Sequence, residues 1–286
     1  MIVSIASGKG GTGKTTVATS LALYLNGKGQ NTVILDCDVE EPDSALFLKP
    51  VLNKPKTVDI PVPTVDFERC TYCGRCAEVC AYNAIAVAKK TVLVFPELCH
   101  GCGGCALFCP EGAISEVGRD IGVVEEGDAS GIKFVQGQLK VGEPMAVPLI
   151  REVKRRGIKE NKEIVIIDVP PGTSCPVIKS VEGSDFVILV TEPTPFGLND
   201  LKLAVETVKK ISIPFGVVIN KDGIGDSGVD LYCELERIPI LTRFPFSREI
   251  AVAYSKGIPI IDAGVEFRQK FEELYDTILS IIQGGL

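Results

Sequence analysis

The sequence predicts an α/β protein with a doubly wound, mostly parallel sheet. Short apolar segments rich in β-branched residues alternate with segments of helical periodicity, which is typical of a parallel sheet covered by helices. A glycine-rich segment near the N-terminus lies between the first such strand and the first such helix. Eight of the eleven cysteines lie between residues 70 and 109, and this clustering indicates a metal-binding segment rather than disulfides. The 286 residues suffice for about two folding units.

Six segments are expected to be buried strands, because they are apolar, largely β-branched and bounded by turn residues. They are Ile2–Ala6, Thr32–Leu35, Ile164–Ile167, Phe186–Val190, Phe215–Ile219 and Pro239–Leu241. Four segments carry apolar residues at helical spacing and are expected to be helices that cover the sheet. They are Thr15–Asn26, Leu198–Ile211, Ser247–Lys256 and Val265–Ile282.

The alternation of strands and helices stops between about residues 50 and 131. Prolines precede the cysteine cluster and glycines follow it, which is a composition typical of linkers. We therefore expect a small domain at residues 61–119, inserted into an α/β domain that is formed by residues 1–60 and 120–286. The host then has a comfortable size for one α/β domain.

The pattern Cys-x2-Cys-x2-Cys-x3-Cys occurs twice, first from residue 70 and again from residue 99. Three closely spaced cysteines can hold one [4Fe–4S] cluster, while the fourth reaches the other cluster. The first predicted ligand set is Cys70, Cys73, Cys76 and Cys109, and the second is Cys99, Cys102, Cys105 and Cys80. Zinc is the alternative, although zinc sites usually use separate cysteine pairs. The single histidine, His100, is expected to be a solvated loop residue.

Residues 8–15, Gly-Lys-Gly-Gly-Thr-Gly-Lys-Thr, match the phosphate-binding P-loop pattern and lie between a predicted strand and a predicted helix. Backbone N–H groups of such a loop, together with the helix N-terminus, bind phosphate oxygens. We expect Lys14 to neutralise the β- and γ-phosphates of a nucleotide and Thr15 to bind Mg²⁺. The predicted nucleotide-binding residues here are Gly8, Gly10, Gly11, Thr12, Gly13, Lys14, Thr15 and Thr16. A glycine-rich turn without a ligand is the alternative.

Aspartates follow two of the predicted strands at the same edge of the sheet. Asp168 follows one strand, while Asp36 and Asp38 follow another and share a face because they are two residues apart. A carboxylate at this edge can hold a Mg²⁺-bound water. Capping of neighbouring helices is the alternative role for these three residues.

Lys9, the segment 36–38 (Asp-Cys-Asp) and the segment 168–173 (Asp-Val-Pro-Pro-Gly-Thr) together resemble the deviant-Walker ATPases. These include the MinD/ParA group, the Mrp-type iron–sulfur carriers and the nitrogenase iron protein. The resemblance implies a MinD-like P-loop fold in which ATP is sandwiched between two subunits, with Lys9 reaching the partner's nucleotide. It also implies that Asp38 orients or activates the attacking water.

The same resemblance assigns roles to four further residues. Asp36 and Asp168 correspond to the acids that support Mg²⁺. Gly172 corresponds to a segment that senses the γ-phosphate. Asn220 corresponds to the residue that contacts adenine, and a turn residue at the end of a strand is its alternative role.

The cysteine-rich segment resembles a bacterial-type ferredoxin with two [4Fe–4S] clusters over about residues 61–119. Cys175 stands seven residues after Asp168, at the spacing of a cluster ligand in the nitrogenase iron protein. A second ligand of that kind is missing, so Cys175 is either a structural loop residue or a redox or shared-cluster thiol. Cys37 and Cys233 are expected to be core residues.

Together these patterns predict an iron–sulfur ATPase that uses ATP/ADP, Mg²⁺ and two [4Fe–4S] clusters. A homodimer formed through the nucleotide face would gate electron transfer to a redox partner protein. The alternative is a carrier of the Mrp type that delivers clusters or metallocofactors to an apo-acceptor.

The net charge and the length of the apolar segments predict the class of partner and the cellular compartment. The net charge is −7 and the run at residues 154–156 is expected to be a solvated helix end, so we expect no nucleic-acid or membrane partner. This disfavours a positioning ATPase on DNA or membrane. The absence of a signal peptide and of long apolar segments predicts a cytoplasmic protein.

Overall fold

The computed structural model describes residues 1–158 and 163–284. Its strands are β1 (Ile2–Ala6), β2 (Thr32–Asp36), β3 (Val51–Leu52), β4 (Lys56–Val65), β5 (Ile85–Ala88), β6 (Thr91–Val94), β7 (Ile114–Ala129), β8 (Ile132–Leu139), β9 (Ile164–Asp168), β10 (Phe186–Thr191), β11 (Phe215–Asp222) and β12 (Ile240–Pro245). Its helices are α1 (Lys14–Gly27), α2 (Ser44–Leu48), α3 (Arg75–Glu78), α4 (Gly104–Leu107), α5 (Ala146–Gly157), α6 (Cys175–Val181), α7 (Pro195–Lys210), α8 (Gly228–Glu236), α9 (Arg248–Ser255) and α10 (Val265–Ile282). Two 3₁₀ turns, η1 (Pro96–Leu98) and η2 (Ile260–Asp262), complete the described elements.

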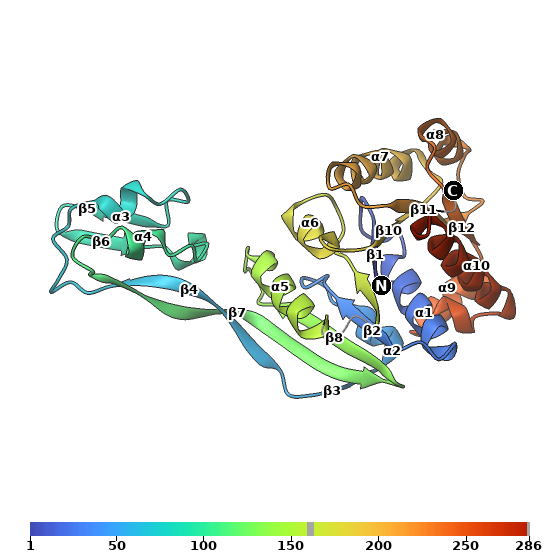
Figure 1. Ribbon diagram of the computed structural model, residues 1–286, viewed down its shortest axis with the longest axis horizontal. Coiled ribbons are helices and arrows are strands. Elements are labelled where there is room, and N and C mark those ends of the chain that lie inside the picture. The colour runs from blue at the N-terminus through green and yellow to red at the C-terminus, as the bar shows by residue number, and fades with distance from the viewer. Residues whose placement is uncertain (159–162, 285–286) are drawn as a thin grey trace.

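The large sheet is doubly wound and mostly parallel, as predicted (Figure 1). Its strand order is β12-β11-β10-β1-β9-β2-β8-β7-β3, and β4 pairs with β7 beside this path. Strands β1, β2 and β8 to β12 run parallel, while β3, β4 and β7 form the antiparallel end. The six strands and four helices expected from the sequence are all present, although β11 and β12 extend several residues further.

Helices cover both faces of the sheet and bury a separate apolar core on each. On one face α5, α6, α7 and α8 contribute residues such as Leu149 and Val205. On the other face α1 and α10 contribute residues such as Leu21 and Phe271. Because strands buried on both faces cannot shift without exposing apolar side chains, their carboxyl ends form a fixed platform for a site.

The expectation of linkers around the cysteine cluster is wrong. β4 and β7 pair in antiparallel fashion from Lys56 opposite Val124 to Val65 opposite Ile114. This ribbon projects from the sheet and carries β5, β6, α3 and α4 at its far end (Figure 1). Proline is tolerated within β4 because that strand pairs on one side only. The expected boundaries at residues 60/61 and 119/120 therefore fall inside continuous strands, and the assignment of residues 61–119 as a domain stays a prediction.

The basic end of α5 is not simply a solvated helix end. Lys154 Nζ donates hydrogen bonds to three backbone carbonyls at the end of α6, where an ammonium group complements the helix dipole. The acceptors and distances are Lys179 O at 3.1 Å, Ser180 O at 2.7 Å and Glu182 O at 2.6 Å. Lys154 therefore ties α5 to α6.

Arg156 ties α5 to the ribbon. Its guanidinium group lies 2.9 Å from Glu126 Oε1 on β7 and 2.6 Å from Glu152 Oε1 on α5 itself. Hydrogen bonds from Arg155 and Arg156 lower the pKa of Glu152 to about 2. The helix α5, which the sequence analysis missed, thus contacts both α6 and the strand that carries the cysteine segment.

The depressed pKa of Glu152 makes a pH-dependent contribution to stability. Because the folded protein favours the charged carboxylate, this contribution is present above the ordinary pKa of 4.5 and is lost as the pH falls to about 2. Glu152→Gln is expected to lower the free energy of unfolding by about 1 kcal/mol at neutral pH, a value reduced by solvent screening. Urea unfolding of the wild type and Glu152→Gln at neutral pH and near pH 2 measures this difference in the free energy of unfolding. An equal loss at neutral pH and near pH 2 would show that packing, not charge, is responsible.

Among the described residues, no helix is long and apolar enough to cross a membrane.

Candidate functional site

The glycine-rich loop connects β1 to α1 at the carboxyl edge of the sheet. Gly11 and Gly13 have φ angles of +76° and +94°, a region that favours glycine. A Cβ on Gly13 would lie 2.3 Å from Asn220 Nδ2, so this position also requires a close approach between the loop and β11. The loop therefore adopts a tight turn at the start of a helix, as a phosphate-binding loop requires.

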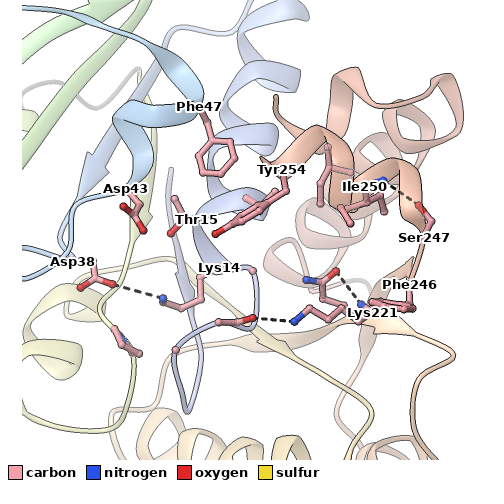
Figure 2. A pocket seen from close by; sticks show the side chains of 18 of the residues that line it. Lys14, Thr15, Asp38, Asp43, Phe47, Lys221, Phe246, Ser247, Ile250 and Tyr254 are labelled. Carbon is pink, nitrogen blue, oxygen red and sulfur yellow. Dashed lines mark hydrogen bonds and ion pairs between the residues drawn. The ribbon is translucent and has the colours of Figure 1, made fainter. Parts of the chain in front are cut away.

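A cavity of about 370 Å³ opens beside this loop. Loop residues 13–16 line one end of the cavity. Its apolar lining consists of Phe47 of α2, Tyr254 of α9, Phe246 and Ile250 (Figure 2). The rings of Phe47 and Tyr254 have centroids 5.5 Å apart. The volume and the mixed lining are typical of sites for small ligands such as nucleotides. No local motif in the sequence marks these apolar residues as part of a site.

Lys14 and Asp38 face each other across the phosphate end of the cavity (Figure 2). Lys14 Nζ lies 3.8 Å from Asp38 Oδ2, and both side chains are largely buried. Burial raises the pKa of Asp38 to about 7, although Lys14 opposes the shift. A carboxyl group with this pKa can accept a proton near neutral pH.

Asp36 and Asp168 lie side by side on β2 and β9, and both are fully buried. Ser44 joins them, because its N–H donates to Asp36 Oδ2 at 2.9 Å and its Oγ donates to Asp168 Oδ2 at 3.2 Å. Burial raises the pKa of both carboxyl groups, and the charge of Asp168 adds to the shift of Asp36. Asp36 Oδ1 also accepts from the N–H of Asp38 at 3.1 Å. Asp36 thus accepts from the first N–H of α2, and its support of Mg²⁺ stays a prediction.

Asp168 Oδ1 is buried and has no hydrogen-bond partner in the described part of the chain. Thr15 lies close to the same carboxylate, and its hydroxyl opposes the rise in the pKa of Asp168. An orphaned carboxylate oxygen beside a threonine hydroxyl fits Mg²⁺, which prefers oxygen ligands and keeps several waters. Thr15 and Asp168 are therefore the residues that fit a magnesium ion here.

The remaining predicted nucleotide residues also lie around the loop. Lys9 Nζ is 3.5 Å from Glu192 Oε2. Gly172 has a φ of +100°, and its N–H donates to Ser7 O at 3.0 Å, which ties the segment after β9 to the loop. Asn220 donates through Nδ2 to Thr12 O at 2.7 Å, so it braces the loop, and its contact with adenine stays a prediction.

Two small cavities at the far end of the ribbon gather the eight clustered cysteines. Cys70, Cys73, Cys76 and Cys109 line the first. Cys80, Cys99, Cys102 and Cys105 line the second. Each cavity thus combines three cysteines of one run with the last cysteine of the other, which is the grouping that the sequence spacing predicts. Iron binding itself stays a prediction.

The two runs adopt matching local structure. Ala84 N–H donates to Cys80 Sγ and Ala113 N–H donates to Cys109 Sγ, each at 3.3 Å. N–H donors to sulfur favour the thiolate that binds iron. His100 is exposed, as expected, and its ring stacks on Tyr82 with centroids 3.5 Å apart.

Within residues 1–158 and 163–284, no group of three or more His, Cys, Asp or Glu side chains is arranged to hold a metal ion. A four-iron cluster makes a different demand, because each cysteine binds a different corner of the cube and the four thiols surround a cavity. Each of the two cavities is lined by four cysteines, the number of ligands that such a cluster uses, and cluster binding stays a prediction.

The other three cysteines lie outside the segment of residues 70–109. Cys37 and Cys233 are buried core residues, as expected, and burial raises the pKa of each thiol, to about 11 for Cys233. Cys175 is exposed and is the first residue of α6, directly after the segment that contains Gly172.

The family model described as the CobQ/CobB/MinD/ParA nucleotide binding domain matches residues 3–260. The chain belongs to this family. Its members are nucleotide-binding ATPases, so the P-loop at residues 8–15 and the adjoining cavity belong to a MinD/ParA-type ATPase. The expected MinD-like P-loop ATPase fold is confirmed. The inserted ferredoxin domain stays a prediction.

Individual relatives and a solved structure are similar to this chain over nearly its whole length. Two uncharacterised proteins of Methanocaldococcus jannaschii are 31% and 33% identical, over 98% and 99% of this chain and 98% of each relative. An iron–sulfur cluster carrier protein of Pyrococcus horikoshii is 26% identical over 99% of this chain and 88% of its own length. Among solved structures, the septum site-determining protein MinD of Pyrococcus horikoshii, complexed with Mg-ADP, matches with a TM-score of 0.60 and 20% identity over 98% of both chains.

Proposed function

We propose that this MinD/ParA-type ATPase is an iron–sulfur redox protein in which ATP binding and hydrolysis by a homodimer control electron transfer to a partner protein. The observation that carries the proposal is the continuity of the sheet. One end of β7 pairs with β8 inside the ATPase, and the other end pairs with β4 in the ribbon that bears the cysteine-lined cavities. A change in the ATPase can therefore reach the cysteines through hydrogen-bonded strands.

The nucleotide part of the proposal rests on the cavity beside the P-loop. Lys14 neutralises the phosphates, and Thr15 and Asp168 hold Mg²⁺, which supplies charge neutralisation when bound. Asp38 orients or activates the attacking water. Lys9, partly exposed at the loop, reaches the nucleotide of the second subunit.

The helix α5 offers a physical connection between the two parts. The segment after Asp168 passes Gly172 and enters α6, whose last carbonyls are bound by Lys154 of α5. Two residues further on, Arg156 binds Glu126 on β7. A shift of α6 on nucleotide binding would therefore move or strain the base of the ribbon. Order changes of such segments on γ-phosphate binding are a known type of switch.

The cysteine part of the proposal rests on the two matched cavities. Bound [4Fe–4S] clusters would supply one-electron transfer there. Each cavity offers four cysteine thiols, so neither ligand set is short of a cysteine. Complete ligation by the chain favours retention of the clusters, and thus electron transfer over delivery.

A cluster carrier is the second candidate function. It is favoured by relatives named iron–sulfur cluster carrier proteins at 26% identity and by the exposed position of Cys175. Anaerobic protein loaded with iron, mixed with an apo-ferredoxin and MgATP, separates the two functions. We expect the iron to stay with the protein. ATP-dependent loss of iron to the acceptor, abolished by Cys175→Ser, would establish the carrier instead.

The role of Asp38 predicts a variant that binds ATP without hydrolysing it. Asp38→Asn is expected to slow phosphate release by about 10²-fold or more, since proton transfer by a positioned group contributes about 10²- to 10⁴-fold. The ATP-dependent dimer should persist, because the amide keeps the size of the side chain. Glu40→Gln, at an exposed position of the same loop, is the matched control. Unchanged phosphate release in Asp38→Asn would remove Asp38 from the reaction.

A further inference from the structure

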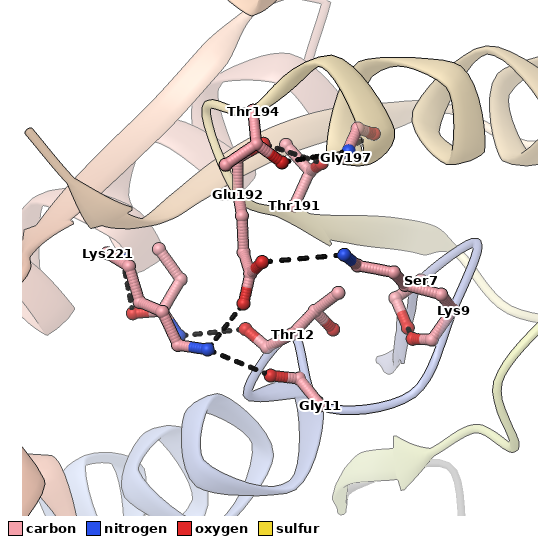
Figure 3. Close-up of polar contacts among 10 residues, drawn as sticks. Ser7, Lys9, Gly11, Thr12, Thr191, Glu192, Thr194, Gly197 and Lys221 are labelled. Atoms are coloured by element: carbon pink, nitrogen blue, oxygen red, sulfur yellow. Dashed lines mark hydrogen bonds and ion pairs between the residues drawn. The ribbon is translucent and has the colours of Figure 1, made fainter. Parts of the chain in front are cut away.

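Glu192 lies directly after β10 and contacts two lysines beside the P-loop (Figure 3). Its Oε2 is 3.5 Å from Lys9 Nζ, and its Oε1 pairs closely with Lys221 Nζ. The Glu192 side chain is only 11% exposed. A carboxylate with so little access to water requires compensation of its charge, and two ammonium groups provide it.

The two lysines are held differently. Lys221 Nζ also donates to Gly11 O at 3.2 Å, so Lys221 fixes the loop as well as Glu192. Lys9 is held at its backbone by a hydrogen bond from Ser7 Oγ to Lys9 O at 2.6 Å. Within the described residues, its ammonium group has no ion-pair partner other than Glu192. The Lys9 ammonium group is therefore held by one ion pair, whereas that of Lys221 is held by an ion pair and a hydrogen bond.

This arrangement lets Lys9 leave at little cost. When Lys9 moves, Lys221 still compensates Glu192, so no buried carboxylate is left without a partner. The cost is then the loss of one partly exposed ion pair, which favours the held position by about 1.5- to 5-fold. Such an ion pair favours the position of Lys9 on Glu192, and a phosphate group can still replace Glu192 as the partner of Lys9.

We propose that Glu192 is a positioning residue that holds Lys9 within its own protomer at rest and releases it to the phosphates of ATP when two protomers meet. The inference rests on the proposed function, because it takes the ATP-dependent dimer as the state in which Lys9 is used. It adds a reason for the dimer to require ATP. Without the phosphate charge, Lys9 stays on Glu192. This ion pair then disfavours the contact of Lys9 with the second protomer.

The first test measures Lys9 directly and needs no dimer. Monomeric, ADP-bound protein is acetylated at lysines with a limiting amount of acetic anhydride, and the modified residues are quantified by mass spectrometry. Glu192→Gln is expected to raise the labelling of Lys9 by about 1.5- to 5-fold, the bias that the ion pair provides. Labelling of Lys89, an exposed lysine in the ribbon segment, serves as the internal reference. Unchanged labelling of Lys9 would overturn the proposal.

The second test measures the consequence for assembly by light scattering at a series of protein concentrations in MgATP. Because a dimer uses two Lys9 side chains, Glu192→Gln is expected to lower the dissociation constant of the dimer by about 2- to 25-fold. Glu192→Asp, which keeps the charge, should lie closer to the wild type.

A purely bracing role through Lys221 predicts the opposite result, namely weaker ADP binding and weaker dimerisation in Glu192→Gln. That outcome, or an unchanged dissociation constant, would overturn the proposal. Loss of the ATP-dependent dimer in the wild type itself would instead contradict the proposed function, and the labelling test would still decide whether Glu192 holds Lys9.

Discussion

Replacement of Cys70 and Cys109 together by serine is expected to remove one cluster and to leave about four of the eight iron atoms per chain. The two residues come from different cysteine runs but line the same cavity. The double variant should therefore lose as much iron as Cys70→Ser or Cys109→Ser alone. Iron analysis of anaerobically purified protein, with electron paramagnetic resonance of the reduced form, measures the outcome.

The matched control is Cys70→Ser combined with Cys80→Ser. These residues belong to the same run but line different cavities, so this variant is expected to lose both clusters. Retention of about four iron atoms in this control, with none in the Cys70/Cys109 variant, would show that each run binds its own cluster. Protein that holds about one zinc ion per run and no iron would contradict the cluster assignment altogether.

Lys9→Ala is expected to abolish the ATP-dependent dimer, leaving a particle of 30.6 kDa in MgATP instead of twice that mass. ATP hydrolysis should fall by about 10³-fold or more, as for other cationic groups supplied across an interface to the transferred phosphoryl group. Binding of ADP to the monomer should persist, because Lys14 and the loop backbone are unchanged.

Light scattering and equilibrium ADP binding on the same samples separate these effects. Lys221→Gln is a useful comparison, since it removes the other lysine on Glu192 and should weaken the loop without removing the group that crosses the interface. A Lys9→Ala protein that still dimerises in MgATP would show that nucleotide is not shared between subunits.

The parts of this protein that the sequence predicted are those in which function depends on local spacing. The loop from Gly8 to Thr15, the strand that ends at Asp168 and the two cysteine runs each place their side chains within a few residues of one another. In such segments the order of the residues determines how the side chains are arranged. The alternation of buried strands with helices likewise gave the mostly parallel sheet.

The ribbon could not be predicted from composition. Pro61 and Pro63 lie inside β4 and Gly118 and Gly122 inside β7, and such residues are more frequent in loops than in strands. Their strand conformation depends on pairing between segments about 60 residues apart, which no local pattern encodes. β4 also tolerates proline only because one of its edges is unpaired.

The apolar and charged partners of the P-loop were missed for a similar reason. Phe47, Tyr254, Glu192 and Lys221 come from four separate segments and meet only in the folded chain. Lys154 is a further case, because its neighbours in sequence suggest a solvated run, whereas its three acceptors belong to α6. Long-range contacts of this kind require the tertiary structure.

The connection through α5 can be examined on the same protein preparations. Lys154→Met removes the ammonium group that binds the end of α6 but keeps an apolar stem of similar length. If α5 transmits the state of the nucleotide site, this variant should retain ATP hydrolysis and both clusters and should lose any effect of MgATP on the cysteine segment. Arg151→Met, at an exposed position of the same helix, is the control.

Coupling between the nucleotide and the clusters is measured by a redox titration of the clusters with and without MgATP. A coupling of about 1–3 kcal/mol would shift a one-electron midpoint potential by about 40–130 mV. We predict a shift in this range that is absent in Lys9→Ala. Identical midpoint potentials and identical rates of electron transfer with and without MgATP would show that nucleotide and clusters are not coupled.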